Sequence, residues 1–148
     1  MRILVGADER TEMTDELGRH LAELGHEVVD TLGPAAGREH RWADLAIEIA
    51  RRIASGEADQ GIVCCWTGTG VSIAANKIPG IRAALCSDAE QARGARLYND
   101  ANILALSLRT TTPALMKEIL EAWFATPQPD PAELDQIAKL EAQSSNEG

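Results

Sequence analysis

Apolar runs and amphipathic stretches alternate along the first 126 residues of the chain. Short apolar runs predict strands, and apolar residues spaced three or four apart predict helices that face a core. Gly25 follows the first helical stretch and marks its end. The predicted strands cover residues 2–7, 26–32, 60–66, 81–87 and 101–107, and the predicted helices cover residues 11–24, 42–55, 71–77, a stretch that ends near Leu97, and 111–125.

Five strand–helix repeats predict an α/β protein, with a parallel sheet covered by helices on both faces and right-handed crossovers. In such sheets ligands bind beyond the carboxyl ends of the strands. That rule selects the segments that follow each predicted strand, which are residues 8–10, the loop 33–40 before Trp42, and residues 65–70, 87–88 and 107–109.

The composition changes after Thr126, where the proline-rich sequence PQPDP predicts a hinge over residues 127–131. We therefore expect one domain over residues 1–126 and an appendage over residues 127–148. Residues 132–142 predict a short amphipathic helix, and the last six residues predict a frayed tail. The apolar face of this helix (Leu134, Ile137 and Leu140) must be buried on its own domain or on a second subunit, and we favour the subunit.

Composition and charge narrow the class of protein. The chain has 148 residues, of which 45% are hydrophobic and 25% charged, as is usual for a globular domain with a real core. It has no apolar run of the roughly 20 residues that a membrane span needs. Its first residues lack a signal peptide, so we expect a cytoplasmic protein. A net charge of -9 argues against nucleic acid as a partner, and an anionic substrate would have to be held by local groups against this charge.

Two of the three cysteines, Cys64 and Cys65, are adjacent, and the third is Cys86. No Cys-x-x-Cys spacing occurs, so neither a disulfide framework nor a zinc site is predicted. Most free cysteines are small buried hydrophobes. Cys65 ends a predicted strand where its side chain can face a ligand, and strand alternation turns Cys64 the other way.

The sequence after Cys65, WTGTG, joins a strand to a helix. Backbone N–H groups at such a helix start bind anions and lower the pKa of a nearby thiol. Gly68 and Gly70 allow a ligand to approach the backbone closely, and Thr67 and Thr69 add hydroxyls. Two other interpretations stay open. The turn could belong to a dinucleotide site, although the third glycine of that motif is absent, or it could be a tight turn that binds no ligand. A P-loop is not favoured, because the Gly-Lys-Ser/Thr sequence that ends this motif is missing.

The segments CCWTGTGVSIAANKIPGIRAALCSD and YNDANILALSLR together resemble the ribose-5-phosphate isomerase B and galactose-6-phosphate isomerase family. The resemblance extends from Met1 to about Trp123. It implies a Rossmann-like three-layer α/β/α sandwich with a five-stranded parallel sheet, assembled as a homodimer or a tetramer. It also implies aldose–ketose isomerisation of a sugar phosphate through a cis-enediolate, without a metal or another cofactor.

The resemblance also implies roles for individual residues. Cys65 matches the base that moves a proton between two carbons, and Thr67 matches the hydroxyl that assists proton transfer between the oxygens. Asn99 matches a residue that supports this site. Asp8 matches an aspartate that holds substrate hydroxyls, and Arg109 matches a phosphate-binding arginine. The enediolate would be held by the backbone N–H groups of the following turn, which are those of Gly68, Thr69, Gly70, Val71 and Ser72.

The sequence departs from the family pattern around this site. Glu9 and Tyr98 stand where the family usually has histidines, and the second histidine is expected to open the sugar ring. Tyrosine can donate a proton in its place, but its pKa near ~10 suits this poorly at neutral pH. Trp66 replaces the usual glycine, and Trp42 replaces a smaller aromatic residue, so both reshape the pocket.

The tail carries acids where the family has phosphate-binding arginines, which removes charge-assisted bonds to a phosphate. Arg10 follows the first strand directly and is the best local replacement. We therefore expect an isomerase that acts on a short open-chain sugar phosphate or an unphosphorylated sugar in place of ribose 5-phosphate. The alternatives are a non-catalytic small-molecule binding protein on the same fold, and a related epimerase or lyase.

Overall fold

The structure is a computed structural model that describes residues 1–145, with side chains to residue 143. Its strands form one parallel sheet in the order β2-β1-β3-β5-β4. The strands are β1 (Arg2–Ala7), β2 (Glu27–Leu32), β3 (Gln60–Cys65), β4 (Ala83–Leu85) and β5 (Ile103–Ser107). The α-helices are α1 (Glu12–Glu23), α2 (Trp42–Ala54), α3 (Thr69–Ala75), α4 (Ala89–Asn99), α5 (Pro113–Phe124) and α6 (Leu134–Ser145).

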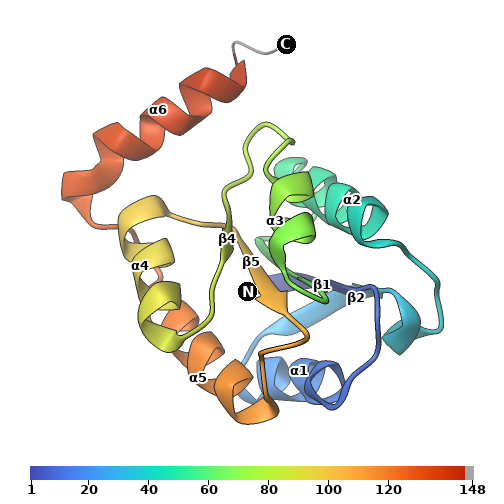
Figure 1. The fold of residues 1–148 in the computed structure, drawn as a ribbon. Coiled ribbons are helices and arrows are strands. Elements are labelled where there is room, and N and C mark those ends of the chain that lie inside the picture. Colours follow the sequence, from blue (N-terminus) through green and yellow to red (C-terminus); the bar gives the residue numbers. More distant parts are fainter. Residues whose placement is uncertain (146–148) are drawn as a thin grey trace.

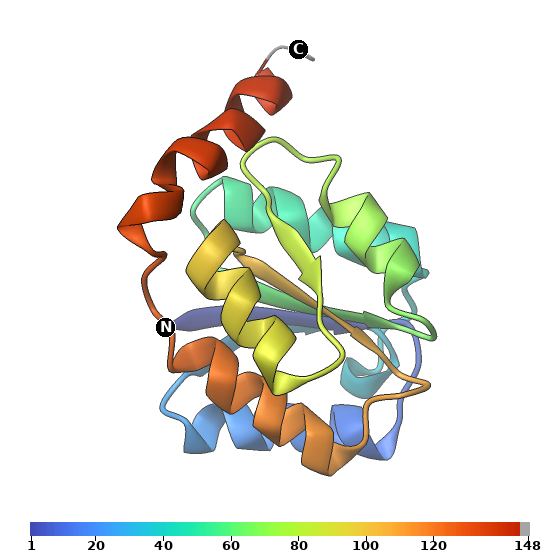
Figure 2. The ribbon, with the colours of Figure 1, turned by 60° about the vertical axis from the view of Figure 1, so that its left-hand side comes forward.

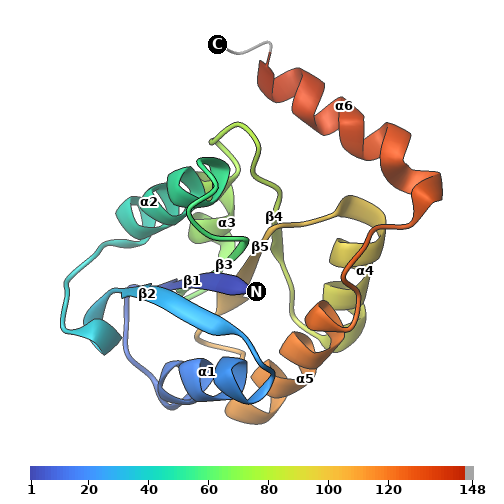
Figure 3. The ribbon, with the colours of Figure 1, turned by 180° about the vertical axis from the view of Figure 1, so that it is seen from behind.

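The sheet lies between two layers of helices (Figure 1). Helices α2 and α3 cover one face, and α1, α4 and α5 cover the other (Figure 2). Seen from behind, β2 is the edge strand nearer the viewer and lies beside β1 (Figure 3). This arrangement confirms the predicted three-layer α/β/α sandwich with a five-stranded parallel sheet.

Alternating side chains of each strand enter two separate cores, because successive residues of a strand point to opposite faces. On β3, Ile62 and Cys64 pack against the layer of α1, α4 and α5. Val63 and Cys65 pack against the layer of α2 and α3. The predicted opposite orientations of Cys64 and Cys65 are therefore confirmed, and Cys65 lies on the side of the helix that follows it.

Some boundaries differ from the predicted ones. Strand β4 has only three residues where seven were predicted, because the backbone N–H of Arg82 donates to the Asn102 side chain (2.8 Å) in place of a strand partner. The predicted loop 33–40 contains a short 3-10 helix, Pro34–Ala36. Helix α3 begins two residues early, at Thr69. Helix α6 extends to Ser145, so residues 143–145 are helical, whereas residues 146–148 of the predicted frayed tail lie outside the described residues.

Helix α6 leans away from the two layers and approaches the domain beside α4 (Figures 1 and 2). Arg96, which is buried, fixes the start of the hinge by donating to the carbonyl oxygens of Thr126 (3.1 Å) and Pro127 (2.8 Å). Ile137 is buried, whereas Leu134 and Leu140 are about half exposed. None of the helices in the described part of the chain has the length and apolar character needed to span a membrane.

Candidate active site

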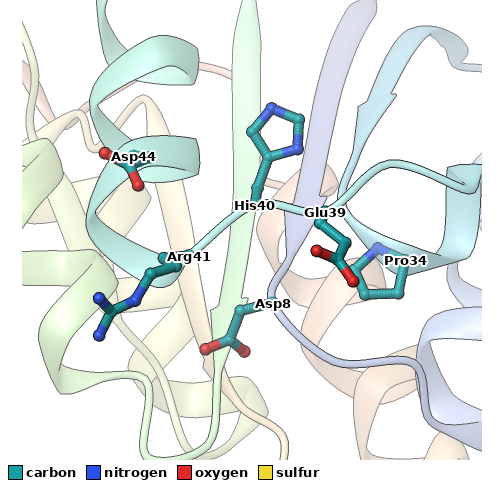
Figure 4. Close-up of a pocket in the computed structure, with 6 residues that line it drawn as sticks. All are labelled: Asp8, Pro34, Glu39, His40, Arg41 and Asp44. Atoms are coloured by element: carbon teal, nitrogen blue, oxygen red, sulfur yellow. The ribbon is translucent and has the colours of Figure 1, made fainter.

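A groove runs along the carboxyl ends of the strands and consists of three adjoining cavities. The central cavity, of about 270 Å³, is lined by Asp8, Trp42, Cys65, Trp66, Thr67, Thr69 and Gly70. The loop cavity, of about 450 Å³, is lined by Asp8, Pro34, Glu39, His40, Arg41 and Asp44 (Figure 4). The Arg109 cavity, of about 240 Å³, is lined by Thr67, Leu85, Cys86, Ser87, Ser107, Arg109 and Thr110. Asp8 and Thr67 each line two cavities and therefore join them.

Cys65 enters the central cavity as the last residue of β3. Its carbonyl oxygen accepts from the backbone N–H of Leu108 (2.9 Å). The next carbonyl oxygen, of Trp66, accepts from the backbone N–H of Arg109 (3.0 Å) and from the Ser107 hydroxyl (2.9 Å). The end of β5 thus holds the backbone on which the thiol is carried, so the thiol has a defined position.

The turn after Cys65 places free backbone donors beside it. Gly68 adopts a left-handed conformation (φ 77°) before helix α3 begins. The first N–H groups of a helix have no partner within it, which leaves those of residues 68–71 available to a ligand. The N–H of Ser72 already donates to the Gly68 carbonyl oxygen (3.3 Å), so the prediction that Ser72 also contributes a donor is wrong. The hydroxyls of Thr67 and Thr69 are 2.8 Å apart.

Two tryptophans form walls of the central cavity. Trp42 and Trp66 are 42% and 52% exposed, which is high for residues of this size. The Trp42 ring packs against Gly70 so closely that a Cβ atom on Gly70 would lie 2.8 Å from it. Glycine at this position therefore allows the indole ring to cover the turn, and the ring narrows the space beside the thiol.

Asp8 offers an unused acceptor where the central and loop cavities meet. Its Oδ1 atom is buried and has no hydrogen-bond partner among the described residues. Burial raises the pKa of the Asp8 carboxyl, and the negative charge of the exposed Glu9 raises it further. A ligand hydroxyl that donates to Oδ1 would satisfy this acceptor.

The other two thiols differ from Cys65 in their surroundings. Cys64 is fully buried, and burial raises its pKa well above the usual range, with Cys65 and Asp8 adding to the effect. Burial and the charge of Asp88 raise the pKa of Cys86 to about 12. Neither thiol is therefore suited to act as a thiolate at neutral pH.

Three of the predicted site residues do not lie in the groove of their own chain. Arg10 pairs with Asp15 (2.7 Å) and lines a separate cavity beside α1. Asn99, in the last turn of α4, lines a cavity beside Arg82, near α6. Tyr98 is exposed, with the Arg93 guanidinium 6.0 Å from its ring centre. Within one chain, therefore, these three side chains are not brought together with Cys65.

Arg109 lines the groove as predicted, whereas Arg41 was missed. Arg41 directly precedes Trp42 in the loop after β2, and the carboxyl-end rule that selected this loop was the signal that could have found it. His40 lines the same cavity, but its ring extends away from Asp8 (Figure 4). Within residues 1–145, no group of three or more His, Cys, Asp or Glu side chains lies close enough to hold a metal ion.

The fold and the groove define an α/β protein in which a thiol, the start of a helix and a carboxylate line one cavity at the carboxyl ends of the strands. The family model described as Ribose/Galactose Isomerase matches residues 3–140. The chain therefore belongs to the ribose/galactose isomerase family, which confirms the predicted class of enzyme, an aldose–ketose isomerase.

Individual relatives agree with this assignment. The chain is 43% identical to ribose-5-phosphate isomerase B of Escherichia coli over 74% of this chain and 72% of the relative. It is 37% identical to D-erythrulose-4-phosphate isomerase of Pectobacterium atrosepticum over 84% of this chain and 82% of the relative. The solved structure of ribose-5-phosphate isomerase B from Clostridium thermocellum superposes with a TM-score of 0.84 at 36% identity, covering 100% of both chains.

We predict that iodoacetamide at about pH 8 modifies Cys65 faster than Cys64 or Cys86 in the folded protein. All three thiols are buried, but Cys65 lines the central cavity beside the start of α3, whereas burial raises the pKa values of Cys64 and Cys86. Peptide mass spectrometry locates the modified residue, and labelling in denaturant, where all three thiols react, is the control. Modification of Cys86 at the same rate as Cys65 would contradict this account of the site.

We predict that Asp8→Asn raises the melting temperature at pH 7. The pKa of Asp8 is raised in the fold, so its ionised form destabilises the folded state above that pKa. Below the ordinary value of 3.8 the carboxyl is protonated in both states, and the advantage of Asn disappears. Thermal unfolding between pH 3 and pH 7 measures this. If Asp8→Asn raised the melting temperature by the same amount at pH 3 and at pH 7, the charge of Asp8 would not be the cause.

Proposed function

We propose that this isomerase interconverts a short open-chain aldose phosphate and the corresponding ketose through a cis-enediolate, with Cys65 as the base. One observation carries the proposal: the Cys65 side chain lines the same cavity as a turn with unused backbone donors. A base next to preorganised donors is what proton abstraction beside a carbonyl requires.

In this mechanism the Cys65 thiolate removes the proton from C2 of the aldose, and the electron pair passes to the carbonyl oxygen to form the enediolate. The N–H groups of residues 68–71 stabilise the resulting negative charge. The Thr67 hydroxyl passes a proton between O2 and O1. The proton on the Cys65 thiol exchanges with solvent, and the thiol then donates a proton to C1. A positioned base contributes about 10²–10⁴-fold and a single oxyanion donor about 10²–10³-fold.

The shape of the central cavity favours a short substrate. Trp42 and Trp66 line a space of about 270 Å³, and the family histidine expected to open a sugar ring is replaced by Tyr98. A four-carbon aldose with a phosphate on O4 has no hydroxyl left to close a five-membered ring, so it needs no ring opening. The relative from Pectobacterium atrosepticum is named for a substrate of this size.

Arg109 adds positive charge on the far side of Thr67. The resemblance matches Arg109 to a phosphate-binding arginine, and we propose that in this chain it instead faces the oxygens of the enediolate. Asp8 accepts hydrogen bonds from substrate hydroxyls through its unpartnered Oδ1 atom. Trp42, which packs on Gly70, and Trp66 border the space for the reacting carbons and reduce their contact with water, which strengthens these electrostatic contacts.

We also propose that the protein is a homodimer in which Tyr98 and Asn99 act in the groove of the second copy. The resemblance assigns both residues to the site, yet in their own chain they lie on the last turn of α4, away from Cys65. Tyr98 is 44% exposed and thus accessible to another subunit. The three free cysteines are consistent with a cytoplasmic location.

We predict that D-erythrulose 4-phosphate is turned over with a higher kcat/KM than ribose 5-phosphate. We also predict that Cys65→Ala lowers kcat by about 10²–10⁴-fold, the contribution of a positioned base. Cys64→Ala is the matched control, because it removes the adjacent thiol, which faces the other core; it should keep kcat and lose about 1 kcal/mol of stability. Efficient turnover of ribose 5-phosphate would contradict the proposed substrate class.

We predict that Cys65→Ala and Tyr98→Phe complement each other when the two chains are unfolded together and refolded. Each variant alone should be impaired. A hybrid dimer has one site with both substitutions and one intact site, so the mixture should recover about a quarter of the wild-type activity. No recovery in a mixture shown to contain hybrid dimers would mean that Tyr98 does not act in the partner's site.

A further inference from the structure

Arg41 lies in a cavity lined by carboxylates, and its side chain has no partner among the described residues. Most arginines of the chain are engaged, as Arg10 is with Asp15 and Arg52 with Asp30. Arg41 makes no side-chain hydrogen bond or ion pair with any described residue, although Asp8, Glu39 and Asp44 line the same cavity. Its charge is therefore available to a ligand.

The position of Arg41 is fixed by the start of helix α2. It is the N-cap residue, its carbonyl oxygen accepts from the backbone N–H of Leu45 (3.1 Å), and its side chain takes no part in capping. The next residue, Trp42, packs on Gly70 of the turn beside Cys65. In Figure 4 the Arg41 and Asp8 side chains extend to the same side of the loop, whereas the His40 ring extends to the opposite side.

The chemistry of the reaction gives the substrate a direction in the groove. An aldose–ketose isomerisation occurs at C1 and C2, the terminal carbons, so the rest of the substrate extends from Cys65 in one direction only. Asp8 is the acceptor for the hydroxyls beyond C2, and it lines both the central cavity and the loop cavity. Beyond Asp8 lies the loop cavity with Arg41, and this is the direction in which the proposed function extends the far end of the substrate.

Because most charged groups of the loop cavity are negative, binding of an anionic group there depends on Arg41. Three carboxylates line this cavity, those of Asp8, Glu39 and Asp44, and Arg41 is the single lysine or arginine among its lining residues. Like charges raise the free energy of a bound anion, and a guanidinium can offset this through paired, charge-assisted hydrogen bonds.

We propose that Arg41 binds the anionic group at the far end of the substrate and thereby selects phosphorylated over unphosphorylated sugars. The proposal rests on the proposed function for the direction of the substrate. In this proposal the terminal anion of the substrate binds in the loop cavity, and Arg109 contacts the reacting end of the substrate.

The test compares the binding of D-erythritol 4-phosphate and erythritol by calorimetry, since neither has a carbonyl group that can react. The wild-type protein should prefer the phosphate. Arg41→Gln should reduce this preference about tenfold or more, the size of one charge-assisted hydrogen bond. Arg51→Gln is the matched control, because Arg51 is exposed near the other end of α2 and has no ion pair among the described residues. It should leave the preference unchanged.

Two results would overturn the proposal. One is a wild-type protein that binds both compounds equally, and the other is a preference that survives in Arg41→Gln but is lost in Arg109→Gln. Because the measurement needs no turnover, an Arg41-dependent preference in a protein that isomerises no sugar would contradict the proposed function and leave the anion site in place.

Discussion

Gly68 lies in the left-handed region directly against the end of β5, and the position of the thiol and the backbone donors depends on this contact. A Cβ atom on Gly68 would lie 2.6 Å from the Leu85 side chain and 2.9 Å from the backbone carbon of Leu106. Neither the backbone conformation nor the space allows another residue without strain. The same stretch of β5 holds the carbonyl oxygens of Cys65 and Trp66, so the turn is fixed from both ends.

The charges around the groove oppose the binding of an anion, as expected for a chain with a net charge of -9. Burial raises the pKa of the Asp8 carboxyl, and the negative charge of Glu9 raises it further. Favourable interactions must therefore come from a few local groups, namely the turn N–H groups, Arg109 and Arg41. A site of this kind depends strongly on each of its cations, which is why single arginine substitutions are informative here.

Much of the fold and the centre of the site could be predicted from the sequence, because they follow from backbone periodicity. Strand alternation alone assigned Cys64 and Cys65 to opposite layers, and the rule for carboxyl ends selected Asp8, Cys65 and Arg109. Side-chain partners could not be predicted in this way. Arg10 follows its strand as expected, but its side chain forms an ion pair with Asp15. Arg41 is exposed, so the spacing of apolar residues gave no indication of its role. Tyr98 and Asn99 occupy positions that the resemblance assigns to the site, but only the fold shows that the last turn of α4 lies away from the groove.

The central claim is that a base in the groove moves a proton by way of an enediolate. The most direct test is turnover of D-erythrulose 4-phosphate in heavy water, with the position of deuterium in substrate and product determined by NMR. The account predicts that solvent deuterium enters at the carbon beside the carbonyl group during turnover. Complete conversion with no deuterium at that carbon would indicate a direct hydride shift and would contradict a proton-transfer role for Cys65.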